Sequence, residues 1–144
     1  MISTVIVDSG PLVAAANAAD PAHQACLDVL RTPGFHLVIP ALCVAEAAYL
    51  INRYRGSQTE SRFLRGLEGF DVQAPLAHDW PRIGELVEQY SDFPLGGTDA
   101  SVIALAERLR TEIIVTLDRR HFGAVRPRHC EHLRLLPVTW EARP

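Results

Sequence analysis

Lysine is absent from the 144-residue sequence, so its 14 basic side chains are all arginine. Schiff-base catalysis and the P-loop binding of nucleotide phosphates both use a lysine amine, and both are therefore excluded. The formal net charge is -3, which argues against a protein that holds nucleic acid through bulk electrostatics. A nucleic-acid substrate stays compatible with this charge if a local arginine rim and a metal ion neutralise its phosphates.

Cysteine is also scarce, and long apolar runs are missing. The three cysteines lie far apart in the chain and are odd in number, which is typical of reduced thiols in a cytosolic protein. No apolar run approaches the roughly 20 residues of a membrane span. The opening residues MISTVIVDSG lack the basic start and the cleavage site of a signal peptide. We therefore expect a cytoplasmic protein that does not enter a membrane.

Short apolar runs alternate with helical segments along the chain, which predicts one α/β domain over residues 1–144 with a tail at 140–144. Short apolar runs predict strands at 4–7, 35–39, 113–117 and 133–138, and a shorter, weaker pattern predicts a fifth at 70–73. The elements follow the order β-α-α-β-α-α-β-α-α-β-α-β. This order predicts an open, mostly parallel five-stranded sheet with helices on both faces.

Two aspartates stand where predicted strands end. Asp8 closes the first strand just before a turn and a helix start, and Asp118 follows the strand at 113–117. Ligands of open α/β sheets bind outside the carboxyl ends of the strands, so both aspartates are candidate site residues. For Asp8, a simple turn or helix cap is the structural alternative.

Two further acids are placed on predicted helices. Asp99 falls in the first turn of a helix capped by Thr98, where the helix dipole should keep its carboxylate ionised at neutral pH. Glu46 falls on the apolar face of a helix that begins after Pro40, where a carboxylate is costly unless it meets a cation or an arginine. A structural salt bridge is the alternative for Glu46. Because Asp99 follows a loop, helix geometry alone does not bring it to Asp118.

Arginines and one more acid lie near these candidates. Arg119 and Arg120 add positive charge directly beside Asp118 and are candidates for substrate binding. Arginines at positions 53, 55, 62 and 65 surround a predicted helix-turn-helix segment, where a solvated face and an RNA-facing rim are both open. Asp92 lies in a loop and is either a turn residue or a peripheral ligand.

Four segments of the chain resemble the PIN-domain family, and more closely the VapC ribonuclease toxins of VapBC toxin-antitoxin modules. They are VIVDSGPLVA, PALCVAEAAYLI, LGGTDASVIALAERL and IIVTLDRRHF, in that order. The resemblance implies a PIN-like fold and an endoribonuclease that depends on Mg²⁺ or Mn²⁺. It also implies a homodimer held inactive by a VapB-type antitoxin. Ser9 and Thr98 each neighbour one of the candidate acids and could supply a supporting hydroxyl.

The resemblance assigns catalytic and metal-binding roles to Asp8, Glu46, Asp99 and Asp118. Two carboxylates about 5 Å apart repel by roughly 3 kcal/mol at an effective dielectric near 20, so converging acids require a cation. Our hypothesis is that Asp8 and Asp99 bind the principal ion and that Asp118 completes the site. Glu46 would then orient or deprotonate the water that attacks the RNA phosphate.

Other functions were weighed against this hypothesis. A phosphatase of the haloacid-dehalogenase type needs a second aspartate where Gly10 stands, and usually a lysine. A phosphoacceptor receiver domain fails on the missing lysine as well. Two alternatives lie within the resemblance itself. One is a PIN scaffold that binds RNA or a protein without cleavage, and the other is a nuclease of RNA maturation that is not a toxin.

Overall fold

The computed structural model describes residues 1–138, so the expected tail from Trp140 lies outside the described residues. Strands and helices alternate in the predicted order. The strands are β1 Ser3–Val7, β2 Phe35–Pro40, β3 Asp71–Gln73, β4 Ile113–Val115 and β5 Arg134–Leu136. The helices are α1 Ser9–Ala15, α2 His23–Leu30, α3 Ala41–Gly66, α4 Asp79–Gln89, α5 Gly97–Leu109 and α6 Arg119–Ala124, with a 3₁₀ turn, η1, at Leu67–Gly69.

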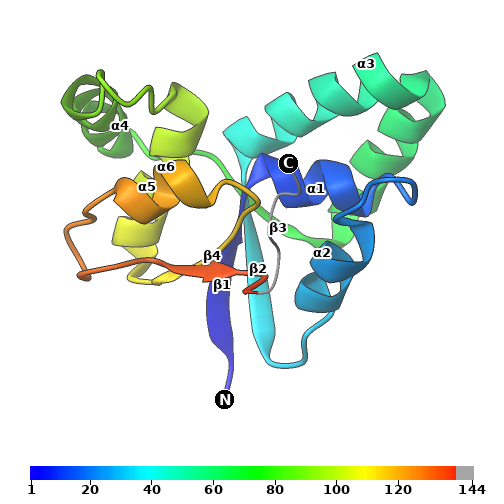
Figure 1. The fold of residues 1–144 in the computed structure, drawn as a ribbon, viewed down its shortest axis with the longest axis horizontal. Coiled ribbons are helices and arrows are strands. Elements are labelled where there is room, and N and C mark those ends of the chain that lie inside the picture. The colour runs from blue at the N-terminus through cyan, green and yellow to red at the C-terminus, as the bar shows by residue number, and fades with distance from the viewer. Residues whose placement is uncertain (139–144) are drawn as a thin grey trace.

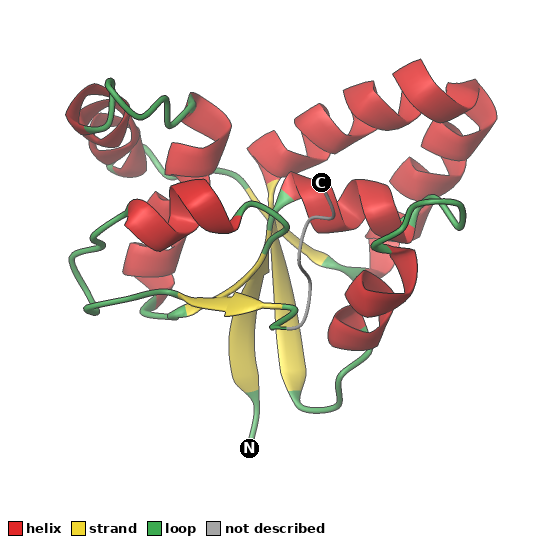
Figure 2. Cartoon of the chain, in the orientation of Figure 1, coloured by secondary structure: helices red, strands yellow, loops and turns green. Residues whose placement is uncertain are grey.

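The five strands form one sheet in the order β3-β2-β1-β4-β5, and every neighbouring pair is parallel. The chain moves outward from β1 through β2 to β3, then returns past β1 to build β4 and β5. Because parallel crossovers are right-handed, this reversal places the two sets of helices on opposite faces. Figure 1 shows α1, α2 and α3 on one side of the sheet and α4, α5 and α6 on the other, and Figure 2 shows the strands between them. The predicted fold is therefore confirmed.

The reversal of strand order falls between β1 and β4. These two strands pair directly, with Ile6 opposite Ile114 and Val7 opposite Val115. In doubly wound sheets such a switch point leaves a crevice outside the carboxyl ends of the two strands, because the following connections depart to opposite faces. The fold therefore places the most accessible ligand position directly beyond Val7 and Val115.

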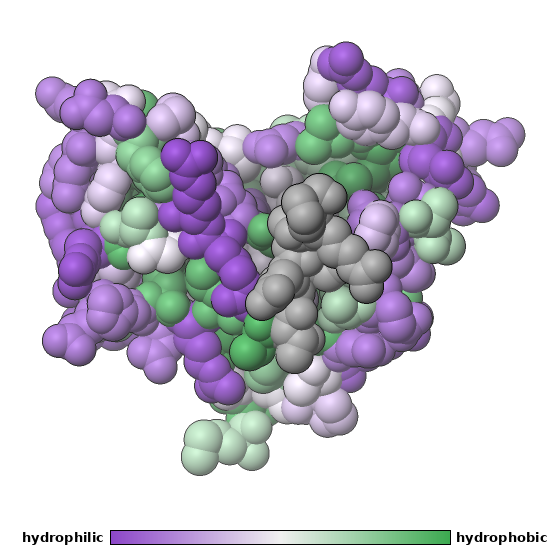
Figure 3. Space-filling model, in the orientation of Figure 1, coloured by the Kyte–Doolittle hydropathy of each residue, from purple (hydrophilic) through white to green (hydrophobic). Residues whose placement is uncertain are grey.

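The centre of the sheet is buried on both faces, as the continuous apolar runs predict. Val5, Ile6 and Val7 of β1 are fully buried, and so are Ile114 and Val115 of β4. The middle of α5, residues 100–106, is buried, and the helix packs against β1 and β2. Figure 3 shows polar residues over the outer surfaces of both helical layers and apolar residues gathered toward the middle of this view. Among residues 1–138, no helix combines the length and apolar character that a membrane crossing requires.

Several predicted boundaries are wrong. The strand at 113–117 ends at Val115, because the next side chain, Thr116, turns its hydroxyl toward Asp8. Helix α5 begins two residues earlier than predicted, with Gly96 as its N-cap, so Thr98 lies inside the first turn and does not cap the helix. The helix break predicted at Gly56 is confirmed, because this residue is non-helical at φ 84° and divides α3 into two helical segments, the second of which ends at Gly66.

A carboxylate cluster at the switch point

Asp8 lies at the carboxyl end of β1 and is only 4% exposed. The Thr116 hydroxyl donates to its Oδ2 at 2.8 Å, and the thiol of Cys43, on α3, lies 3.7 Å from its Oδ1. Burial raises the pKa of Asp8, and the charges of Glu46 and Asp118 add to that rise, while hydrogen bonds from Thr116 and the Ser9 amide oppose it. Asp8 is thus a rigidly held carboxylate at the position that the sequence predicted.

Glu46 extends from the second turn of α3 toward the same edge of the sheet. The prediction that it projects into an apolar face is wrong, because its side chain is exposed while its neighbours Cys43 and Ala47 face the core. Its partner is also different from the predicted arginine. The hydroxyl of Ser9, at the start of α1, donates to Glu46 Oε1 at 3.1 Å. Ser9 therefore supplies the supporting hydroxyl that was expected of it.

Asp99 lies in the first turn of α5 and is partly buried. Burial raises its pKa to about 7, and the charges of Asp8, Asp118 and Glu46 add to the rise, with a small opposing effect from His121. The expectation that the helix N-terminus keeps Asp99 ionised at neutral pH is therefore wrong. A helix dipole is a weak influence beside desolvation combined with three like charges.

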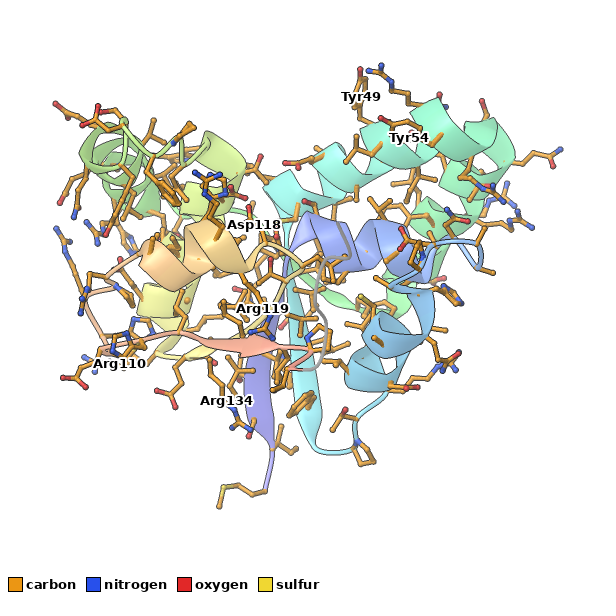
Figure 4. All side chains as sticks on the ribbon, in the orientation of Figure 1. Tyr49, Tyr54, Arg110, Asp118, Arg119 and Arg134 are labelled. Atoms are coloured by element: carbon orange, nitrogen blue, oxygen red, sulfur yellow. The ribbon has the colours of Figure 1, made fainter. Side chains whose placement is uncertain are left out.

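Asp118 follows β4 and caps the first turn of α6. Its backbone amide donates to Thr116 Oγ1 at 3.0 Å, so one hydroxyl joins the Asp8 side chain to the Asp118 backbone. Both Asp118 oxygens accept from His121, one from the amide at 2.9 Å and the other from ring Nδ1 at 2.7 Å. Figure 4 shows Asp118 between the two helical layers. The four predicted acids thus meet from four separate segments of the chain.

The donor set at this edge fits a small divalent cation. Carboxylate oxygens of Asp99 and Asp118 lie within 4.8 Å of one another and of a ring nitrogen of His121. Carboxylate oxygens suit Mg²⁺ and Mn²⁺, and a cation would relieve the mutual repulsion that raises the pKa of Asp99. The chemistry of the site is therefore that of a cation held by acids on the rim of a sheet.

Two side chains that hold this cluster were missed by sequence reasoning. His121 stands three residues after Asp118, a spacing at which side chains in a helical turn meet. Thr116 interrupts an otherwise apolar run two residues before the same aspartate. Both signals are present in the sequence, but each becomes informative only once Asp118 is accepted as a site residue.

The other predicted site residues lie at varying distances from the acids. Arg119 donates to the backbone carbonyl of Pro137, beyond β5, and Figure 4 shows it on that side of α6. The Arg120 guanidinium lies over the ring of Phe93, 5.2 Å from its centroid. Among the described residues, neither the Thr98 hydroxyl nor the exposed Asp92 carboxylate forms a hydrogen bond with any of the four acids. Substrate binding by the two arginines stays a prediction.

The fold and this cluster define a class of protein: a doubly wound parallel α/β domain with an acidic ligand site at its switch point. The family model for the PIN domain matches residues 5–126, a span that contains all four acids. Ribonuclease VapC26 of Mycobacterium tuberculosis is 36% identical over 125 residues, which cover 85% of this chain and 93% of that protein. The chain therefore belongs to the PIN-domain family, in the branch that contains the VapC proteins.

Solved structures agree on the fold. The Mycobacterium tuberculosis VapC20 structure, described as a sarcin-ricin loop cleaving toxin, gives a TM-score of 0.69 at 18% identity and covers 76% of this chain and 86% of its own. A toxin-antitoxin complex from Klebsiella pneumoniae gives 0.63 at 18% identity, over 84% of this chain and 92% of that one. At these identities the likeness is evidence of shared architecture alone.

Proposed function

We propose that this protein is a metal-dependent endoribonuclease, the toxin of a type II VapBC-like system. The observation that carries the proposal is the meeting of Asp8, Glu46, Asp99 and Asp118 at the switch point, with the pKa of Asp99 raised to about 7 by burial and by its neighbours. A cluster of like charges destabilises the folded protein, and such clusters are typical of functional sites. The ribonuclease name of the 36% identical relative supports the same reaction.

The cofactor of the proposal is Mg²⁺ or Mn²⁺. Asp8 and Asp99 would hold the principal ion, and Asp118 would complete the site from the other side of the switch point. When bound, such an ion neutralises the acids, polarises phosphate oxygens and acidifies a coordinated water. Asp8 is suited to hold the ion in a fixed position, because Thr116 and Cys43 limit the rotation of its carboxylate.

The proposed role of Glu46 is to activate the water that attacks the RNA phosphate. Its side chain is exposed at the edge of the cluster and is steadied on one oxygen by the Ser9 hydroxyl, which leaves the other oxygen free to accept a proton. In the proposed step Glu46 takes a proton from water as the water oxygen attacks phosphorus in line. The P–O3′ bond breaks and the departing 3′ oxygen takes a proton from solvent water, so the products carry a 5′-phosphate and a 3′-hydroxyl.

The proposed partners follow from the VapC relationship. An antitoxin of the VapB type would hold the protein inactive, and the toxin-antitoxin complex from Klebsiella pneumoniae supports this expectation. A homodimer, a cytoplasmic location and RNA contacts by Arg119 and Arg120 belong to the same proposal. A PIN scaffold that binds without cleavage, or a nuclease of RNA maturation, would differ in the experiments below.

Cleavage of an end-labelled RNA panel tests the reaction. We expect cleavage with Mn²⁺ or Mg²⁺, complete loss in excess EDTA, and recovery when the metal is restored. Ligation of an adaptor that requires a 5′-phosphate identifies the product ends. Undiminished cleavage in EDTA would contradict the proposed chemistry, and RNA binding without cleavage at any metal concentration would favour the binding scaffold.

Expression of the protein alone tests the toxin assignment. We expect growth arrest within a few generations of induction, and relief when a small protein encoded beside it is expressed as well. Asp99→Asn should abolish the arrest at equal protein abundance. Normal growth alongside active RNA cleavage in vitro would instead indicate a maturation nuclease.

A further inference from the structure

His121 lies beside the acids without being one of them. Its ring Nδ1 and Asp118 Oδ2 are 2.7 Å apart, and its amide and Asp118 Oδ1 are 2.9 Å apart. Because a carboxylate oxygen accepts, ring Nδ1 is the donor in the first of these bonds. That nitrogen is thereby engaged with Asp118 and is not available to a metal ion.

The ring of His121 also has a partner from a distant part of the chain. The Phe93 ring, in the loop between α4 and α5, lies 4.8 Å from it between centroids, at an interplanar angle of 47°. The Arg120 guanidinium lies over the same Phe93 ring. This loop leads directly into the first turn of α5, which carries Asp99. The stack therefore connects the segment that bears Asp118 with the segment that bears Asp99.

A second contact ties the same two segments together. The Tyr90 hydroxyl, at the end of α4, accepts a hydrogen bond from the Arg126 amide, just beyond α6, at 2.9 Å. The loop is thus attached to the α6 segment at its start, through Tyr90, and at its middle, through Phe93. Since Asp99 follows a loop rather than a strand, some tertiary contact has to bring it to the switch point. The Phe93–His121 stack is the contact nearest the acids.

We infer that His121 is a positioning residue for the metal site, which orients the Asp118 carboxylate and holds it in register with Asp99 through Phe93. This inference rests on the proposed function. A carboxylate that accepts two hydrogen bonds from one residue cannot rotate freely, so its remaining lone pairs keep one direction. Groups that orient metal ligands in this way commonly change metal affinity by about 10–100-fold when they are removed.

Three variants separate the two contacts. His121→Ala removes both the ring and the hydrogen bond, and His121→Phe keeps a ring against Phe93 but lacks the donor. His121→Asn returns an amide donor near the position of Nδ1 without the ring. The matched control is His36→Ala, because His36 Nε2 also lies 2.8 Å from an aspartate oxygen, of Asp71, at the far edge of the sheet.

Mn²⁺ binding to the whole protein without RNA is the readout, by calorimetry and by electron paramagnetic resonance. We expect Mn²⁺ affinity to fall about 10–100-fold in His121→Ala and His121→Phe, to recover by more than half of the lost free energy in His121→Asn, and to stay unchanged in His36→Ala. RNA cleavage should follow the affinity, with the loss overcome by added Mn²⁺.

Three outcomes would overturn the inference while leaving the proposed function intact. They are wild-type Mn²⁺ affinity in His121→Phe, an equal loss in His121→Asn and His121→Ala, and an imidazole nitrogen coupled magnetically to Mn²⁺ in the wild-type protein. The last result would make His121 a direct ligand. A wild-type protein that neither binds Mn²⁺ nor cleaves RNA would instead reject the proposed function itself.

Discussion

Two regions of this molecule handle negative charge in opposite ways. Between α4 and α5, Glu107 accepts from Arg82 at both oxygens, at 2.8 and 2.9 Å, and also from the Arg128 amide. Although burial acts to raise it, the pKa of Glu107 is lowered, because hydrogen bonds from Arg82 and from the Arg128 amide favour its charged form. Asp79, buried at the start of α4, likewise accepts from Arg108 at 2.9 Å.

At the switch point, the neighbours of each acid include other acids. Among residues 1–138, none of the four forms an ion pair with an arginine, and the only basic side chain within 4 Å of one of their oxygens is His121, whose Nδ1 lies 2.7 Å from Asp118 Oδ2. Burial and like charges raise the pKa of Asp99 to about 7. The chain carries 14 arginines and uses several of them between α4 and α5. Acids without an arginine partner among the described residues agree with the proposal that a cation from outside the chain neutralises them.

The largest expected effect is on catalysis. Asp99→Asn should lower RNA cleavage by at least about 100-fold, because loss of a metal ligand removes several kcal/mol of transition-state stabilisation. Initial rates on a labelled RNA at saturating Mn²⁺ measure the change. The matched control is Asp92→Asn, an exposed acid of the neighbouring loop, which should keep its activity. Equal activity in both variants would remove the cluster from the mechanism.

Glu107→Gln should have the largest effect on stability. Arg82, only 11% exposed in its side chain, would keep only its more exposed partner Glu85, so the free energy of unfolding should fall by about 3 kcal/mol. Urea denaturation in EDTA measures it. Asp99→Asn under the same conditions should be neutral or stabilising, since it removes a repelled charge. A comparable loss in both variants would mean that the two regions do not differ as described.

The pH dependence of stability should be of intermediate size and opposite in sign in the two regions. The folded protein keeps a proton on Asp99 up to about pH 7, whereas the unfolded chain releases it near its ordinary value of 3.8. Metal-free protein should therefore lose stability as pH rises between these values. Glu107, with its lowered pKa, contributes stability that is lost as pH falls below its ordinary value of 4.5.

Thermal unfolding in EDTA from pH 3 to 8 measures both contributions. Asp99→Asn should flatten the decline above pH 4, and Glu107→Gln should flatten the loss at acid pH. Saturating Mn²⁺ should also abolish the decline in the wild-type protein, because ion binding favours the ionised acids. A wild-type melting temperature that rises steadily from pH 4 to 7 in EDTA would contradict the raised pKa of Asp99.

The smallest effect on the free energy of unfolding is expected at Glu85, the most exposed acid that pairs with Arg82 or Arg128. Glu85 is 52% exposed in its side chain and accepts from Arg82 at 3.0 Å and from Arg128 at 2.9 Å. Glu85→Gln should lower the free energy of unfolding by less than about 1 kcal/mol, because exposed pairs are screened by solvent. Urea denaturation of Glu85→Gln and Glu107→Gln under the same conditions measures the difference. An equal loss of unfolding free energy in the two variants would contradict the argument that the more buried pair contributes more.

Local sequence patterns were sufficient to predict much of the fold. The apolar runs located the three central strands, β1, β2 and β4, because strands buried on both faces require continuous apolar side chains, and weaker patterns located the edge strands β3 and β5. The order of elements then implied a parallel sheet, which placed Asp8 and Asp118 at the same rim. Boundaries were less well predicted, as at Thr116, where a side-chain hydrogen bond to Asp8 takes the chain out of the strand.

The properties of individual site residues were predicted less well. Glu46 was expected against an apolar face and is exposed, because the environment of a helix face depends on which elements pack beside it. Asp99 was expected to be ionised, yet its pKa is raised by burial and by acids contributed from other segments. Such environments combine contributions from residues that are distant in sequence, so periodicity and local propensity do not describe them.

By itself, the sequence determined the class of fold, the strand ends that carry Asp8 and Asp118, and the absence of lysine chemistry. These follow from side-chain type and spacing within short segments, where propensity and burial act locally. Only the tertiary structure decided that Thr116 joins two acids, that Phe93 packs on His121, and that no arginine of residues 1–138 forms an ion pair with the four acids. Those contacts join distant segments, and electrostatic energies depend on the distances that folding creates.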